Sequence, residues 1–326
     1  MKATAEAHPI EGLVKYHGMR DEELRMPYHD SISVCTAPSR TRTTVEFLPD
    51  AGDEEDDYVI DGEPVTGRGA ERIASVVDHV RELAGIDHPV RMVSENSFPS
   101  NVGFGSSSSG FAALATAAVH AAGMDLSRPA ISAVARRGSA SAARAVTGGF
   151  SHLRTGLNDV DCRSERIETG LEDDLRIVTA LVPAYKETEE AHREAADSHM
   201  FQARMAHVHG QIAAMRDALY DDDFDRAFEL AEHDSLSLAA TTMTGPAGWV
   251  YWQPETIAVF NAVRELRRGD DVPVYFSVDT GASVYVNTTA DYVDEVEAAV
   301  SAVGVDTTVW EVGGPARTLD ADEALF

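Results

Sequence analysis

The residues best suited to chemistry lie in a glycine- and serine-rich stretch at 98–111, Phe-Pro-Ser-Asn-Val-Gly-Phe-Gly-Ser-Ser-Ser-Ser-Gly-Phe, which leads into an alanine-rich run. Glycine lets a ligand approach the backbone, and a helix N-terminus presents N–H groups and a positive dipole end. This arrangement is suited to a phosphate chain. A plain linker has a similar composition, and the stretch matches neither a Walker A loop nor the dinucleotide-binding glycine spacing.

Three charged side chains are further candidates. Asp279 follows the apolar run 274–278, so its carboxylate stands at the end of an expected strand, where it either accepts a proton from an alcohol or forms a turn. Lys15 is one of 3 lysines in a chain with 24 arginines, and its retention indicates a specific role rather than an exposed solvating group. Arg144 stands among alanine, glycine and serine residues, which let a carboxylate approach its planar guanidinium.

The charge of the chain limits its partners. The formal net charge is −28 and the isoelectric point is about 4.6. No basic stripe is present to neutralise a nucleic acid, and a strongly negative field repels anionic ligands such as ATP. We interpret the carboxylates as an adaptation to a salt-rich cytoplasm, where the repulsion reaches only about 3 Å at 1 M salt. The alternative is an ordinary acidic protein.

Other features predict a cytoplasmic protein with no membrane partner. Cys35 and Cys162 do not form a disulfide framework. The N-terminus lacks the apolar core of a signal peptide, and no window approaches about 18 continuous apolar residues. The 326 residues suffice for two lobes, which we place at 1–176, with the phosphate loop at 98–111, and at 177–326.

The elements that must position these residues follow from apolar periodicity. Alternating and β-branched residues predict strands at 10–16, 31–35, 43–48, 90–94, 177–182, 274–278, 283–286 and 307–312. Helical spacing predicts helices at 69–83, 111–122, 127–146, 187–220, 224–240, 255–267 and 292–303. We interpret the acidic run 53–57 as a solvated hairpin tip, and Arg136 and Arg137 as helix-surface residues. A calcium-loop spacing from Asp221 is rejected because Arg226 stands where the loop requires glycine.

Four blocks of the chain resemble the mevalonate diphosphate decarboxylases of the GHMP kinase superfamily. They are Lys-Tyr-His-Gly-Met at 15–19, the loop 99–110, the segment 135–150 with its Arg-Arg-Gly-Ser-Ala-Ser core, and Val-Asp-Thr-Gly-Ala at 278–282. Their order and spacing match the family over nearly the whole chain. The resemblance implies an α+β GHMP kinase fold with a ribosomal-protein-S5-like N-terminal lobe, a ferredoxin-like C-terminal lobe and an active-site cleft between them.

The resemblance also implies roles for individual residues. Asp279 would be the catalytic base, Lys15 would keep it ionised, and Arg144 would bind the substrate carboxylate. ATP and Mg²⁺ are implied as cofactors, with Ser107 as a magnesium contact. The implied substrate-binding residues are Tyr16, Arg72, Ser139 and Ser141. The implied ATP-binding residues are Pro99, Gly103, Gly105, Ser106, Ser107, Ser108 and Gly110.

The chain departs from the family pattern where the substrate phosphates bind. The family reads Lys-Tyr-Trp-Gly-Lys in the first block, and Met19 replaces its second lysine, which faces the diphosphate. A serine-arginine segment of the family is replaced by Lys-Glu-Thr-Glu-Glu-Ala-His-Arg at 186–193. Losing a cation removes charge-assisted hydrogen bonds of about 1.5–3 kcal/mol each, which favours a substrate with one phosphate. In this respect the chain resembles the archaeal phosphomevalonate decarboxylases.

That resemblance implies ATP-dependent decarboxylation of mevalonate 5-phosphate to isopentenyl phosphate, CO₂, ADP and phosphate, in the mevalonate pathway of isoprenoid biosynthesis. It also allows a homodimer. Three alternatives stay open: a diphosphomevalonate decarboxylase that makes isopentenyl diphosphate, a GHMP small-molecule kinase that stops at phosphorylation, and a non-catalytic ligand sensor. The sensor is disfavoured because Lys15, Arg144, Asp279 and the loop are all present.

Overall fold

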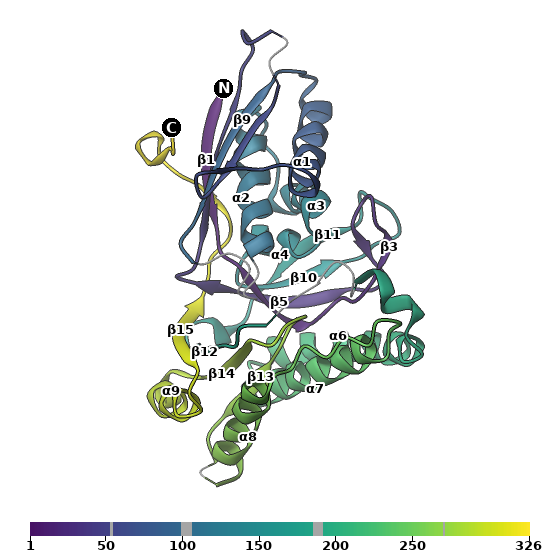
Figure 1. Ribbon diagram of the computed structural model, residues 1–326, viewed down its shortest axis with the longest axis vertical. Helices are drawn as coiled ribbons and strands as arrows, with labels where there is room; N and C mark the ends of the chain where they lie inside the picture. Colours follow the sequence, from purple (N-terminus) through teal and green to yellow (C-terminus); the bar gives the residue numbers. More distant parts are fainter. Residues whose placement is uncertain (53–54, 99–105, 185–191, 270) are drawn as a thin grey trace.

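Two sheets, one above the other in Figure 1, organise the chain, and the computed structural model describes residues 1–52, 55–98, 106–184, 192–269 and 271–326. The first sheet has the strand order β16-β1-β6-β9-β7-β8. Only its β7–β9 pair is parallel among the described pairs. Its strands are β1 (Lys2–Ala7), β6 (Thr41–Phe47), β7 (Asp57–Ile60), β8 (Glu63–Pro64), β9 (Val90–Asn96) and β16 (Arg317–Thr318).

Helices α1 (Arg68–Ala84), α2 (Ser106–Ala121) and α3 (Arg128–Gly138) lie beside this sheet. The α2 helix packs against β1 and β6, and the alanines along it are almost all buried. Because alanine has the shortest apolar side chain, the helix lies close to the strands. Its N-terminal turn is thereby held against the start of β2 (Ile10–Val14), where Ser108 Oγ accepts a hydrogen bond from Ile10 N at 3.2 Å.

The second sheet combines strands from both halves of the chain, in the order β11-β10-β5-β15-β12-β14-β13, with β2 paired to β5. β5 and β15 join the halves through the pairs Glu311–Ala37 and Val312–Thr36. The strands are β5 (Ser31–Ala37), β10 (Phe150–Arg154), β11 (Arg163–Ile167), β12 (Leu175–Leu181), β13 (Val274–Ser277), β14 (Val284–Thr289) and β15 (Asp306–Val312). A small hairpin pairs β3 (Met19–Asp21) with β4 (Met26–Pro27).

Helices cover both faces of the C-terminal strands. Ile177, Tyr275 and Tyr285 point into the core shared with α6 (Phe201–Tyr220) and α7 (Phe224–Met243). The neighbouring residues on the same strands point to the opposite face, into the core shared with α8 (Pro254–Gly269) and α9 (Val293–Ser301). The alternation of strand side chains therefore builds two cores on one sheet.

The strands predicted from the sequence are all confirmed, with ends shifted by a few residues. The helix predicted at 127–146 is wrong as a single element. It ends at Gly138 and resumes as α4 (Ala142–Thr147). Arg72 donates two hydrogen bonds, of 2.9 and 2.8 Å, to the Gly138 carbonyl, and Phe111 occupies the space that a Gly138 side chain would need. The helix predicted over 187–220 is also wrong as a single element: a 3₁₀ turn at Ala195–Asp197 and an extended Ser198 precede α6, which begins at Phe201. Residues 187–191 lie outside the described residues.

Two charged residues differ from their sequence interpretation. Arg136 is fully buried rather than on a helix surface, and its guanidinium bonds the carbonyls of Cys162 and Leu24. In the acidic run, Asp56 is not simply solvated, because it accepts hydrogen bonds from Arg81 at 2.6 Å and from Val90 N at 2.9 Å. Residues 53–54 of the same run lie outside the described residues.

The division into lobes at 176/177 stays a prediction. That boundary falls within β12 (Leu175–Leu181), and the second sheet continues across it. The last part of the chain also returns to the first sheet, where β16 pairs with β1 beside the N-terminus (Figure 1).

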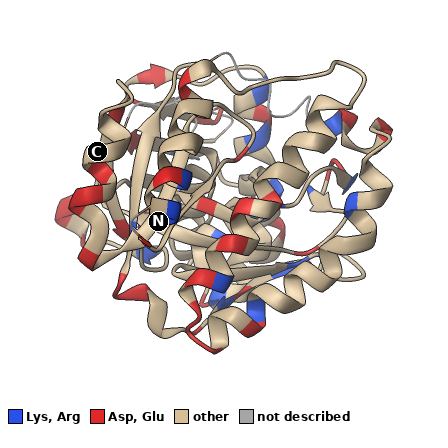
Figure 2. Ribbon diagram, turned by 90° about the horizontal axis from the view of Figure 1, so that it is seen from below, with Lys and Arg blue, Asp and Glu red and all other residues tan. Residues whose placement is uncertain are grey.

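Acidic residues are spread over the elements seen in Figure 2, with fewer basic ones between them. Within the described ranges, no helix is both long enough and apolar enough to span a membrane. A net charge of −28 produces repulsion between like charges within the folded protein.

We predict that the protein loses stability and activity when salt is removed. The melting temperature should fall steadily as KCl is lowered from about 3 M to about 0.1 M, because the Debye length grows from a few ångströms to about 10 Å. Circular dichroism melts at each concentration measure this, with sucrose at matched osmolality as the uncharged control. An unchanged melting temperature in dilute buffer would contradict the salt-adaptation hypothesis.

Candidate active site

Lys15 lies directly after β2, buried at 5% exposure. Its ammonium group donates hydrogen bonds to Ser277 Oγ at 3.0 Å and to Ser235 Oγ at 3.1 Å. The register of β2 against β5 shifts between Gly12 and Val14. This irregularity lies immediately before Lys15, at the point where the strand ends and the chain turns toward α6 and α7.

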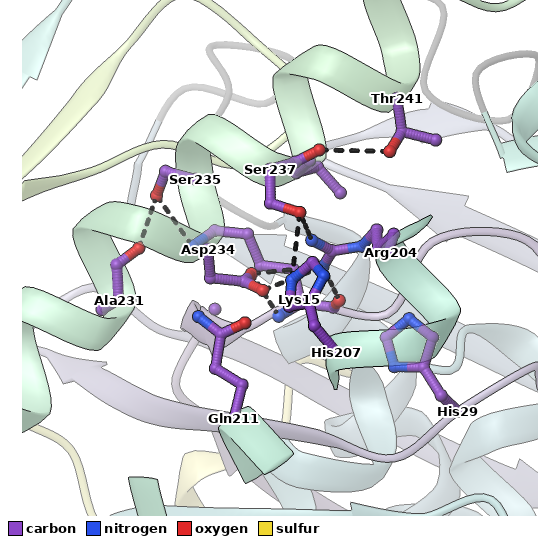
Figure 3. Close-up of polar contacts among 12 residues, drawn as sticks. Lys15, His29, Arg204, His207, Gln211, Ala231, Asp234, Ser235, Ser237 and Thr241 are labelled. Atoms are coloured by element: carbon purple, nitrogen blue, oxygen red, sulfur yellow. Dashed lines mark hydrogen bonds and ion pairs between the residues drawn. The ribbon is translucent and has the colours of Figure 1, made fainter. Parts of the chain in front are cut away.

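A buried ion pair holds the backbone of Lys15 on both sides, as Figure 3 shows. Asp234 Oδ2, from α7, accepts a hydrogen bond from Lys15 N at 2.8 Å, and Arg204 Nη2, from α6, donates to Lys15 O at 2.6 Å. Arg204 and Asp234 bond to each other at 3.0 Å, with side-chain exposures of 1% and 0%. Removing one partner of such a pair costs about 3–5 kcal/mol, so this lysine is tightly positioned.

Asp279 follows β13 and faces Lys15 across Gly12. A Cβ on Gly12 would lie 2.9 Å from Asp279 Oδ1 and 2.7 Å from Lys15 Cγ, so only glycine leaves room for both side chains. Burial lowers the pKa of Lys15, and the carboxylates of Asp234 and Asp279 oppose this effect. The site therefore pairs an ammonium group and a carboxylate in a space with little water.

Arg144 lies on α4, is 3% exposed, and places its guanidinium carbon 5.4 Å from the centre of the Tyr16 ring. Its Nε and Nη1 atoms have no hydrogen-bond partner among the described residues. Burial lowers the pKa of Arg144, and Asp279 is among the groups that oppose this. A buried guanidinium with unused donors is prepared to receive an anionic group.

Tyr16 lies in a part of the site that is surrounded by arginine side chains. Burial raises the pKa of Tyr16, and the positive charges of Arg144, Arg25 and Arg72 oppose it. His192 stacks on the Tyr16 ring with centroids 5.0 Å apart. A positive region is thus built inside a protein of strongly negative net charge.

The remaining predicted residues lie close to this region or in the loop. Ser139 and Ser141 share a hydrogen bond of 2.8 Å between their hydroxyls, just before α4. In the serine run, Ser107 is exposed and Ser108 is buried. No acidic residue lies in the first turn of α2. Pro99, Gly103 and Gly105 lie outside the described residues, as does the side chain of Ser106.

Comparison with known proteins identifies the family. Residues 7–164 match the model of the diphosphomevalonate decarboxylase-like N-terminal domain. Over 326 residues the chain is 77% identical to the phosphomevalonate decarboxylase of Haloferax volcanii, with 100% of both chains covered. The chain belongs to the family of phosphomevalonate and diphosphomevalonate decarboxylases. The decarboxylase family predicted from the four sequence blocks is therefore confirmed.

Solved structures confirm the expected GHMP kinase fold of this decarboxylase family member. The mevalonate diphosphate decarboxylase of Staphylococcus aureus is 29% identical, with a TM-score of 0.92 and 98% of each chain covered. A structure of MDDEF in complex with MVAPP, AMPPCP and magnesium is 27% identical, with a TM-score of 0.91 and coverage of 98% of this chain and 99% of that chain.

The structure brings the adjacent residues Lys15 and Tyr16 together with Arg144 and Asp279, which lie far from them in the sequence. The predicted contact Arg72 is near this group, but its guanidinium also holds the end of α3. The catalytic and binding roles of these residues stay predictions. Sequence reasoning missed several neighbours of the group: Glu11, Arg25, His192, Arg204 and Asp234.

One of the missed residues had a signal in the sequence. Glu11 is the single charged residue in the run Ile-Glu-Gly-Leu-Val of β2, and a charge in an otherwise apolar strand needs a reason. Arg204 and Asp234 had no such signal, because charged residues are common on the amphipathic helices that carry them.

We predict that Gly12→Ala lowers kcat at least about tenfold, or about 1.4 kcal/mol in the barrier, because the new methyl group displaces Lys15 or Asp279. Steady-state kinetics and a thermal melt measure this. Gly210→Ala is the matched control, since the space around Gly210 on α6 is open. A wild-type kcat in a folded Gly12→Ala variant would show that Gly12 does not set the spacing of the two side chains.

Proposed function

We propose that this chain catalyses the ATP-dependent decarboxylation of mevalonate 5-phosphate to isopentenyl phosphate, CO₂, ADP and phosphate. The observation that carries this proposal is the buried guanidinium of Arg144, with donors unused among the described residues, in the same site as Lys15 and Asp279. The full-length identity of 77% to a phosphomevalonate decarboxylase supports the choice of substrate.

Each of the three residues has a distinct task in this reaction. Arg144 binds the substrate carboxylate and fixes the C–C bond that breaks when CO₂ leaves. Asp279 accepts the proton of the tertiary alcohol that is phosphorylated. Lys15 keeps Asp279 ionised and offsets negative charge on the oxygens near it.

The first turn of α2 is the proposed phosphate site. Its N–H groups, the exposed Ser107 and the absence of acidic residues in that turn suit an anion. The Ser108–Ile10 hydrogen bond ties this turn to β2, the strand that leads to Lys15. ATP with Mg²⁺ supplies the phosphoryl group that turns the alcohol into a good leaving group, and the MDDEF structure with AMPPCP and magnesium supports this pair for the family. We propose Ser107 as a contact of the metal.

The surroundings of Met19 support a substrate with one phosphate. Met19 packs against an apolar cluster that includes Met26, Ala140 and Ala143, and Tyr16 packs against the same cluster. It therefore presents a thioether, not a cation, at the edge of the substrate region. The alternative is decarboxylation of mevalonate 5-diphosphate. The solved relative from Staphylococcus aureus carries the name of that reaction, so both substrates belong in the test.

The proposal is tested by measuring CO₂, ADP and phosphate release with mevalonate 5-phosphate and mevalonate 5-diphosphate in high salt. We expect the monophosphate to give the higher kcat/KM. ADP release without CO₂ would instead identify a kinase, and a higher kcat/KM for the diphosphate would identify the alternative decarboxylase.

We predict that Asp279→Asn abolishes CO₂ release, with a loss of at least about 10²-fold in kcat, because general-base help is typically worth 10²–10⁴-fold. ATP binding, followed by fluorescence titration with a labelled nucleotide, should stay close to that of the wild type. Asp225→Asn, on α7, serves as a control for the loss of one negative charge. Turnover of Asp279→Asn within a few-fold of wild type would remove Asp279 from the mechanism.

We predict that Met19→Lys shifts the kcat/KM ratio toward mevalonate 5-diphosphate, by roughly tenfold or less, since one exposed cation supplies about 1.4 kcal/mol or less. The ratio of the two substrates cancels general losses of folding or ATP binding. Met19→Leu is the neutral control of similar size and should leave the ratio unchanged. An unchanged ratio in Met19→Lys would place the choice of substrate elsewhere in the site.

A further inference from the structure

Glu11 is a fully buried carboxyl group to which the proposed reaction gives no task. It lies on β2 at 0% exposure, and its Oε1 atom accepts a hydrogen bond from Asn287 Nδ2, on β14, at 2.8 Å. Its Oε2 atom has no hydrogen-bond partner among the described residues. Burial raises the pKa of Glu11 to about 8, against the opposing effects of Asn287 and Lys15.

Ser277 stands between this carboxyl group and Lys15. Its hydroxyl accepts a hydrogen bond from the Lys15 ammonium at 3.0 Å and donates to the carbonyl of Gly12 at 3.1 Å. Ser277 is also among the groups that lower the pKa of Glu11. Ser277 is therefore bonded both to the Lys15 ammonium group and to the backbone of Gly12, the residue next to Glu11.

The charged groups that face Lys15 come from every element packed against it. Asp234 on α7, Asp279 after β13, Glu11 on β2 and Arg204 on α6 all act on its pKa. The groups that act on Glu11 are Lys15, Asp279, Asn287 and Ser277. Glu11 in turn acts on the Tyr285 hydroxyl of β14.

Two of the three carboxyl groups near Lys15 have another task, one in an ion pair and one in the proposed reaction. Asp234 is paired with Arg204, and Asp279 becomes neutral in the proposed reaction when it accepts the alcohol proton. Burial disfavours an ammonium group without a compensating charge. Of these three carboxyl groups, Glu11 takes part neither in the Arg204–Asp234 ion pair nor in the proposed proton transfer.

We propose that Glu11 is a positioning residue that, once ionised, supplies a buried counter-charge to the Lys15 ammonium group from behind Ser277. This rests in part on the proposed function of Lys15, whose charge is required beside Asp279. Below about pH 8 Glu11 is neutral and acts as a buried polar contact; above it, Glu11 is a carboxylate and supplies the counter-charge. The effect on Lys15 therefore grows as the pH rises above the pKa of Glu11.

Glu11→Gln is the test variant, because glutamine has nearly the shape of a neutral glutamic acid and keeps an oxygen for Asn287. The chain has only 3 lysines, so protein labelled with ¹³Cε-lysine gives few NMR signals, and Lys15→Arg identifies the one from Lys15. Titration of the full-length protein from about pH 6 to about pH 11 then follows the charge of Lys15 without any dependence on activity.

We predict that the Lys15 pKa is lower in Glu11→Gln than in the wild type, by about one pH unit, which is a tenfold change in proton affinity. The alkaline limb of the kcat profile should move down by a similar amount, while kcat near pH 7 stays within several-fold of wild type. Glu172→Gln is the matched control. Burial raises the pKa of Glu172 too, but it pairs with Arg166, and neither residue is among the groups that act on Lys15.

A Lys15 pKa that is unchanged or higher in a folded Glu11→Gln variant would overturn this proposal, and a thermal melt establishes that the variant is folded. Ser277→Ala calibrates the size of such an effect, because it removes a hydroxyl that accepts a hydrogen bond from the Lys15 ammonium group and should lower the Lys15 pKa even with Glu11 in place. A lowered Lys15 pKa with an unchanged kcat profile would support the role of Glu11 and count against the proposed role of Lys15 in the reaction, so the two failures are distinguishable.

Discussion

The buried pair of Arg204 and Asp234 is the interaction on which the site depends. The two side chains pair with each other, and each also bonds the backbone of Lys15. Arg204 donates a further hydrogen bond to Ser237 Oγ at 2.9 Å. Helices α6 and α7 are thereby attached to the end of β2, at the point where the chain leaves the strand. Because a buried ion pair contributes little net stability but is costly to break, its value here lies in fixing one peptide rather than in strengthening the fold.

The second constraint is space. Gly12 is required because Lys15 and Asp279 occupy the volume of any larger side chain. Gly138 similarly leaves room for Phe111, and the break in the helix at this point places Ser139 and Ser141 at the start of α4, which carries Arg144. Small residues thus decide how closely the charged groups approach one another.

A protein with a net charge of −28 repels anionic ligands with its own field, and the proposed reaction requires such ligands. The compensation is local. Cationic side chains lie around Tyr16, and Lys15 is buried beside carboxylates that oppose the lowering of its pKa by burial. Burial makes these short-range interactions strong and protects them from salt, whereas the repulsion from surface carboxylates is screened. The same salt that the surface requires therefore leaves the site largely unaffected.

The sequence alone was sufficient to predict the family, many of the strands and the candidate residues Lys15, Tyr16, Arg144 and Asp279, because periodicity and short motifs depend on local order along the chain. It did not predict β1, β10 or β11. It was not sufficient for the break at Gly138, the burial of Arg136, or the contacts of Glu11, Arg204 and Asp234. These depend on contacts between residues separated by up to 276 positions, as in the Glu11–Asn287 hydrogen bond. Whether a charged side chain is solvated, paired or buried is decided by the elements that pack over it, and only the tertiary structure brings those elements together.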